Sequence, residues 1–77
     1  MLKVLLVGAG QIGSRYLQGL ICSTLNISIT VVDPLDISLN VSKKRWIEAG
    51  GDQSLHTISW NKELPSNKER FDLIIVT

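Results

Sequence analysis

Three glycines early in the chain have the spacing of a phosphate-binding turn: Gly8, Gly10 and Gly13 in the segment GAGQIG. In such a turn the first glycine permits a tight bend, the second leaves room for a pyrophosphate, and the third lets a helix pack closely. The backbone amides of Gln11 and Ile12 would then face the phosphates at the positive end of a helix. The spacing predicts a dinucleotide site, with a plain strand-to-helix turn as the alternative.

An acidic residue follows this turn at the distance where such sites hold the adenosine ribose. Asp33 lies 20 residues after Gly13 and precedes Pro34. Its carboxylate can accept hydrogen bonds from the ribose hydroxyls. A 2′-phosphate at roughly 4 Å would be repelled by about 4 kcal/mol per unit charge at an effective dielectric constant of about 20. The sequence therefore predicts NAD rather than NADP, with a helix cap or turn residue as the alternative role of Asp33.

Five other side chains are weaker candidates for chemistry. Ser14 could give a hydroxyl to the phosphates or be a small residue in a first turn. Arg15 could face phosphate, although a cation there opposes the helix dipole. Trp60 and Thr77 end apolar segments on the side where a ligand would lie, with packing favoured for Trp60. For His56, the single histidine, the sequence shows no acid or nucleophile in a pattern that marks a catalytic partner, which favours a structural or exposed role.

Composition excludes several classes of protein. The chain has 77 residues, 44% of them hydrophobic and 19% charged, with a net charge of +1. We therefore expect neither nucleic acid nor a membrane as partner, and we interpret the basic cluster at 43–45 as a solvated helix face. The single cysteine, Cys22, cannot form an internal disulfide or a multi-cysteine zinc site, so we predict no metal and a buried thiol. The apolar run before Gly8 is too short for a signal sequence, which predicts a cytoplasmic protein.

The pattern of apolar residues predicts an α/β fold. Segments 2–8, 27–33, 54–60 and 71–77 have the composition of strands, and the first, second and last are apolar enough to be buried. Helical spacing appears around 12–21 and 36–51. Alternation of this kind gives a doubly wound parallel sheet with the strand order 3-2-1-4. The prediction is a partial Rossmann fold that is truncated after its fourth strand.

The same pattern predicts which helix faces turn inward. For the first helix the apolar stripe comprises Ile12, Tyr16, Leu17, Leu20 and Ile21. For the second helix Asp36 could cap the first turn and Gly50 could end the helix in a left-handed turn. The inward face of that helix comprises Leu39, Trp46 and Ala49, with Ser42 interrupting it.

The segments KVLLVGAGQIGSRYLQGL, VVDP and FDLIIVT resemble the N-terminal half-domain of the Gfo/Idh/MocA oxidoreductases, the glucose–fructose oxidoreductase and inositol dehydrogenase family. Tyr16 departs from the family, where histidine is common. The resemblance implies hydride transfer between a nicotinamide and a hydroxyl-bearing carbon of a sugar, nucleotide sugar or cyclitol. It implies cofactor roles for Gly8, Gly10, Gln11, Ile12, Gly13 and Asp33.

No catalytic residue carries over from that family. Its lysine in an E-K-P-like motif and its later histidine follow the fourth strand, beyond these residues. We therefore expect residues 1–77 to be the N-terminal portion of the dinucleotide-binding domain of an NAD-dependent oxidoreductase, inactive alone, whose catalytic and substrate domain is absent and whose intact form is a homo-oligomer. The alternatives are a regulatory NAD- or nucleotide-binding domain and a fragment of an S-adenosylmethionine-dependent methyltransferase.

Overall fold

Strands and helices alternate along the chain in the predicted order. The computed structural model describes residues 1–66 and 68–77. Its elements are β1 (Leu2–Val7), α1 (Gln11–Ile21), β2 (Ile27–Val32), α2 (Asp36–Glu48), the 3-10 turn η1 (Gly51–Gln53), β3 (Thr57–Asn61) and β4 (Leu73–Val76). None of the helices in these residues is long and apolar enough to cross a membrane.

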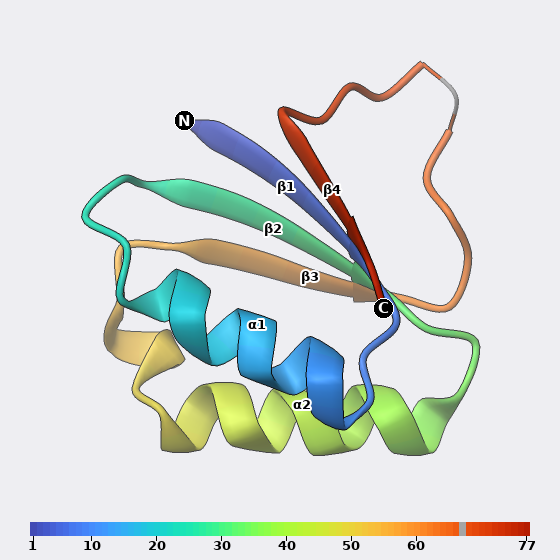
Figure 1. The fold of residues 1–77 in the computed structure, drawn as a ribbon, viewed down its shortest axis with the longest axis horizontal. Helices are drawn as coiled ribbons and strands as arrows, with labels where there is room; N and C mark the ends of the chain where they lie inside the picture. Colours follow the sequence, from blue (N-terminus) through green and yellow to red (C-terminus); the bar gives the residue numbers. More distant parts are fainter. Residues whose placement is uncertain (67) are drawn as a thin grey trace.

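The four strands form one parallel sheet in the order β3-β2-β1-β4. This confirms the predicted α/β architecture of a partial Rossmann fold. Both helices lie on the same face of the sheet (Figure 1). Because every strand runs in the same direction, the carboxyl ends of all four meet at one edge, and the turn from β1 into α1 starts there.

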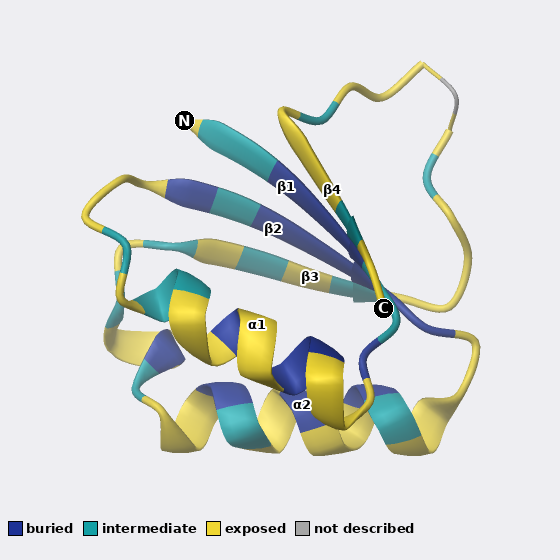
Figure 2. Cartoon of the chain, in the orientation of Figure 1, coloured by how far each residue is buried: buried dark blue, intermediate teal, exposed yellow. Residues whose placement is uncertain are grey.

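The core lies between the helices and the two central strands (Figure 2). Val4 pairs with Ile29 and Leu6 with Val31, and each of these side chains is at most 1% exposed. Branched apolar side chains on adjacent parallel strands explain why these segments form buried strands. Full burial of each such side chain contributes about 1.5–3 kcal/mol.

The predicted apolar stripe of α1 is only partly correct. Leu17 is 1% exposed, whereas Ile12 is 64% exposed and Tyr16 is 48% exposed. The buried face instead begins with two small residues, Gly13 and Ser14. Small residues allow α1 to approach its neighbours closely, and a pattern based on hydrophobicity alone does not count them.

The second helix also differs from the prediction at its ends. Leu35 is the N-cap, and the carboxylate of Asp36 forms an exposed ion pair with Lys62 at 2.9 Å instead of capping the helix. Gly50 ends the helix in the left-handed conformation, as predicted. Ala49 is exposed rather than inward because the helix already ends at Glu48, one residue before it.

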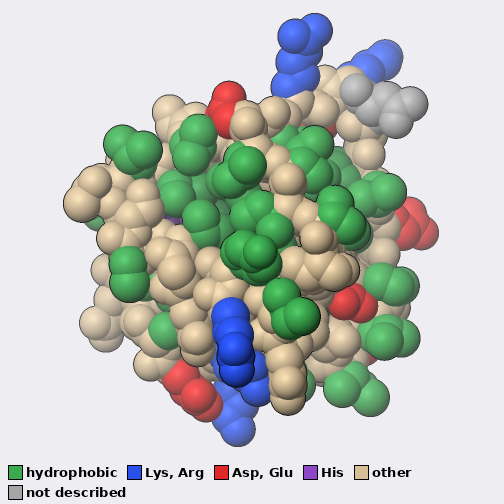
Figure 3. Space-filling model, in the orientation of Figure 1, with side chains coloured by type: hydrophobic (Ala, Val, Ile, Leu, Met, Phe, Trp, Pro, Cys, Tyr) green, Lys and Arg blue, Asp and Glu red, His purple; other side chains and the backbone are tan. Residues whose placement is uncertain are grey.

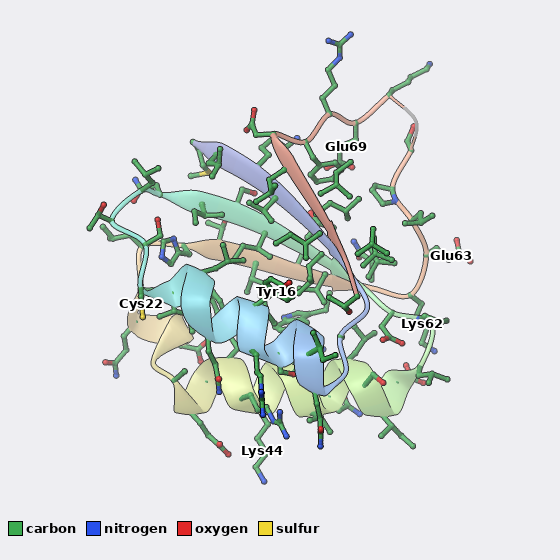
Figure 4. All side chains as sticks on the ribbon, viewed as in Figure 1. Tyr16, Cys22, Lys44, Lys62, Glu63 and Glu69 are labelled. Atoms are coloured by element: carbon green, nitrogen blue, oxygen red, sulfur yellow. The ribbon has the colours of Figure 1, made fainter. Side chains whose placement is uncertain are left out.

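The outer face of α2 meets solvent as predicted. Lys43 and Lys44 are exposed, and Lys44 projects away from the sheet (Figure 4). Lys44 lies opposite Trp46 and Leu39, which are 3% and 6% exposed. Lys43 is their neighbour on the helix, and its ammonium lies 6.0 Å from the ring centroid of Trp60. Arg45 is half-buried, so the prediction of a solvated face is correct for Lys44 and only partly correct for Lys43 and Arg45.

Two predictions of burial were wrong. Cys22 is exposed, because it stands at the C-cap of α1, where the chain leaves the helix (Figure 4). Strand β4 is the sheet edge, and Leu73, Ile74 and Val76 are 45%, 57% and 73% exposed. The space-filling view shows hydrophobic side chains at the surface over the strands (Figure 3). Within the described residues β4 has one strand neighbour, β1.

Candidate functional site

A cavity of about 400 Å³ lies at the carboxyl ends of the strands, beside the turn between β1 and α1. In open parallel sheets this edge is where ligands bind. The structure brings all of the predicted cofactor residues to this one cavity and adds two more. Its lining comprises Gly8, Gly10, Gln11, Ile12, Gly13, Asp33, Ser38 and Thr77.

Two of the turn glycines are required by the fold itself. Gly8 has a φ of +100°, and a Cβ there would lie 2.9 Å from the carbonyl oxygen of Thr77. A Cβ on Gly13 would overlap the carbonyl oxygen of Gly8. These glycines therefore permit the tight bend and the close helix approach that the spacing predicts.

Gly10 is different, because no neighbouring atom excludes a side chain there. Its φ is −57°, and a Cβ built on it meets no atom within 4 Å. The residue lines the cavity. The missing side chain leaves open space at the cavity wall, which is what a ligand that approaches the backbone needs.

The N-terminus of α1 also faces this cavity. Gly10 is its N-cap, no side chain caps it, and its first turn holds no acidic residue. The first amides of a helix lack partners within the helix and carry partial positive charge. Gln11, Ile12 and Gly13 belong to this first turn and to the cavity lining, so their amides are placed to bind an anion.

Asp33 is held firmly at the opposite wall. The residue is only 8% exposed. One carboxylate oxygen, Oδ2, accepts from the Ala9 N–H at 2.9 Å, and Oδ1 accepts from the Leu35 N–H at 2.8 Å. The bond from the Leu35 amide, two residues further along the chain, shows that Asp33 has the turn role that was the alternative to ribose binding. Each carboxylate oxygen can accept a further bond, so the same group retains capacity for a ligand hydroxyl.

The weaker candidates fall in different places. Ser14 is fully buried and does not line the cavity. Its hydroxyl lies 3.1 Å from the Ala9 carbonyl oxygen and 3.0 Å from the Ser42 hydroxyl. Of the two roles considered for it, the structure shows the small residue in the first turn of the helix. Arg15 lines a separate hollow on the flank of α1 with Tyr16 and other residues, away from Asp33. Thr77 does line the cavity, and its hydroxyl donates to the Gly8 carbonyl at 3.1 Å.

His56 has the structural role that was favoured. Its Nδ1 accepts from the Ile27 N–H at 3.2 Å, and its Nε2 lies 3.2 Å from the Ile21 carbonyl oxygen. An amide can only donate and a carbonyl can only accept, so the proton is on Nε2. The ring thus joins the end of α1 to the start of β2. Trp60 packs against the core, with the Lys43 ammonium 6.0 Å from its ring centroid.

Sequence reasoning missed two serines. Ser38 lies in the first turn of α2 and lines the cavity. A polar residue in the first turn of the helix that follows Asp33 was a usable signal. Ser42 appeared only as an interruption of an apolar face, yet it is fully buried. A polar residue at an inward position was the signal that it has a partner.

Comparisons with family models, with curated proteins and with solved structures found no match to this chain. Among residues 1–66 and 68–77, no three side chains of the types His, Cys, Asp and Glu gather as a metal would require.

Proposed function

We propose that this chain is the NAD-binding portion of an oxidoreductase. The observation that carries the proposal is the open space at Gly10, between the uncapped end of α1 and the carboxylate of Asp33. The fold explains Gly8 and Gly13 without a ligand. It does not explain Gly10, whereas a pyrophosphate close to the backbone does.

The residues of the cavity match the two ends of an adenosine diphosphate group. The amides of Gln11 and Ile12 bind phosphate oxygens at the helix end. The carboxylate of Asp33 accepts from the ribose hydroxyls and repels a 2′-phosphate, which favours NAD over NADP. The nicotinamide of the bound cofactor supplies the hydride chemistry, and the described residues supply binding and orientation.

The class of reaction rests on the resemblance to the Gfo/Idh/MocA oxidoreductases. It implies hydride transfer to or from a hydroxyl-bearing carbon of a sugar, nucleotide sugar or cyclitol. No residue of the cavity is assigned to catalysis, because its side chains are Gln11, Ile12, Asp33, Ser38 and Thr77 and its remaining lining is glycine. Asp33 is already engaged by two backbone amides.

Calorimetric titration with NAD, NADP and S-adenosylmethionine tests this proposal. We expect NAD to bind most tightly, and Gly10→Ala to weaken it about ten-fold or more, since a loss of about 1.4 kcal/mol is a factor of ten. Gly19→Ala is the matched control, because a Cβ there also meets nothing within 4 Å but Gly19 lies outside the cavity. Binding of S-adenosylmethionine without NAD would overturn the proposal in favour of a methyltransferase.

A further inference from the structure

The residue between the first two turn glycines is held on both sides by side chains. Ala9 is fully buried. Its N–H donates to Asp33 of the β2 end, and its carbonyl oxygen accepts from Ser14 of α1 and from Ser42 of α2. We call these three contacts the Ala9 clamp. They come from three different elements, and the side chains that make them are at most 8% exposed.

The hydroxyl protons are sufficient for the clamp. The Ser14 Oγ lies 3.1 Å from the Ala9 oxygen and 3.0 Å from the Ser42 Oγ. A carbonyl oxygen accepts two bonds and each serine has one proton, so both serines can donate to Ala9. Both protons are then used, and the contact between the two Oγ atoms carries no hydrogen bond of its own. Within the described residues no buried side-chain polar atom lacks a hydrogen-bond partner. The cluster is therefore fully satisfied, which makes removal of one member costly.

The clamp fixes the direction of an amide that faces the cavity. The Ala9 carbonyl and the Gly10 N–H belong to one planar peptide, and the described chain has no cis peptide bond. In a trans peptide these two groups point in opposite directions. Because the serines hold the carbonyl toward the interior, the Gly10 N–H is directed away from them, on the residue that lines the cavity.

We propose that Ser14 and Ser42 are positioning residues that preset the Gly10 amide as a hydrogen-bond donor to an anionic ligand. Neither lines the cavity, so both act through Ala9. This inference rests on the proposed function for the identity of the ligand, a dinucleotide phosphate. The claim that the two serines orient the turn in the ligand-free protein does not depend on that function. Presetting a donor before binding saves the cost of ordering it when the ligand arrives.

The test compares Ser42→Ala with the unsubstituted chain and with Ser59→Ala. Ser59 is an exposed serine on β3 that lies outside the cavity lining and makes one long hydrogen bond, of 3.5 Å, to the Thr30 hydroxyl. In the ligand-free protein we expect Ser42→Ala to speed hydrogen exchange of the Ala9 amide about ten-fold and to shift the Gly10 amide resonance, with the Val31 amide unchanged. Its dissociation constant for NAD should rise about ten-fold, and Ser59→Ala should change nothing. Ser42→Cys, which keeps the shape and a weak donor, should recover part of both effects.

The outcomes separate the two proposals. Unchanged Ala9 exchange and Gly10 resonance in Ser42→Ala would overturn the clamp. An equal rise in exchange at Ala9 and Val31, without recovery in Ser42→Cys, would also overturn it, because the serine would then serve only global stability. Failure of the unsubstituted chain to bind NAD would overturn the proposed function, while the exchange data would still decide whether the turn is clamped.

Discussion

The buried carboxylate of Asp33 accepts a hydrogen bond from the backbone N–H of Ala9 at 2.9 Å, so the end of β2 is tied to the glycine turn after β1. The residue that is placed to hold ribose therefore also shapes the turn that is placed to hold phosphate. A substitution at Asp33 changes both ends of the cavity. Comparing NAD with NADP, which differ only at the ribose, separates the effect on ribose binding from the effect on the turn.

Asp33→Ala should weaken NAD more than NADP and so narrow the ratio of their dissociation constants. The ribose acceptor is lost for NAD, whereas for NADP a repulsive charge is lost as well. The free energy of unfolding should fall by about 1–3 kcal/mol, because the buried Ala9 amide loses its acceptor and the half-buried bond from the Leu35 amide is lost as well. Calorimetric titrations and urea unfolding measure these changes.

Ser42→Ala is the control for the effect on the turn alone. It should weaken NAD and NADP by the same factor, because Ser42 does not line the cavity near the ribose acceptor. Tighter binding of NADP than of NAD by the unsubstituted chain would contradict the role given to Asp33.

His56→Ala should lower the free energy of unfolding by about 1–3 kcal/mol. It removes both ring nitrogens, which leaves the Ile27 amide and the Ile21 carbonyl without these partners. Leu55→Ala is the neighbouring control, since Leu55 is 80% exposed and should change stability by about 0.5 kcal/mol or less. Equal urea midpoints for the two variants would show that the histidine bridge contributes nothing.

Leu17→Ala and Tyr16→Ala test which side of α1 meets the core. Leu17 is 1% exposed and Tyr16 is 48% exposed. We expect about 2–5 kcal/mol of destabilisation for Leu17→Ala and much less for Tyr16→Ala. Thermal unfolding followed by circular dichroism measures both, and a larger loss at Tyr16 would restore the stripe predicted from hydrophobicity.

A protein of these residues should self-associate through the edge strand β4, whose segment LIIV carries no charge or proline. Ile74→Lys should shift it toward monomer in sedimentation velocity, because charge on an exposed edge opposes pairing. Ile37→Lys, on α2 at 78% exposure, is the control. If the unsubstituted protein sediments as a monomer at all concentrations, β4 does not mediate self-association of these residues.

The strands and helices could be predicted because local patterns mark them, and the parallel order followed from their alternation and from the right-handedness of strand–helix–strand connections. Apolar runs rich in branched residues mark β1 and β2, and the glycine spacing marks the turn between β1 and α1. The orientation of α1 could not be predicted from hydrophobicity, since Gly13 and Ser14 face inward through contacts with other elements. The cavity residues Gly8, Gly10, Gln11, Ile12, Gly13 and Asp33 were found from the glycine spacing together with the strand before it, the helix after it and the acidic residue at the end of the next strand. The partnership of Ser14 with Ser42 depends on how α1 and α2 meet, and no local pattern encodes that.

Thr77 bounds the same cavity as Gly8, and 69 positions along the chain separate them. Strands β1 and β2 lie much closer together in sequence, so their pairing closes a shorter loop than the pairing of β1 with β4. During synthesis the last wall of the cavity therefore arrives only after the rest of the sheet has emerged. A ligand that contacts Thr77 would bind only molecules in which β4 is docked. Such binding would hold the strand against local unfolding, so occupancy of the cavity and closure of the sheet are thermodynamically linked.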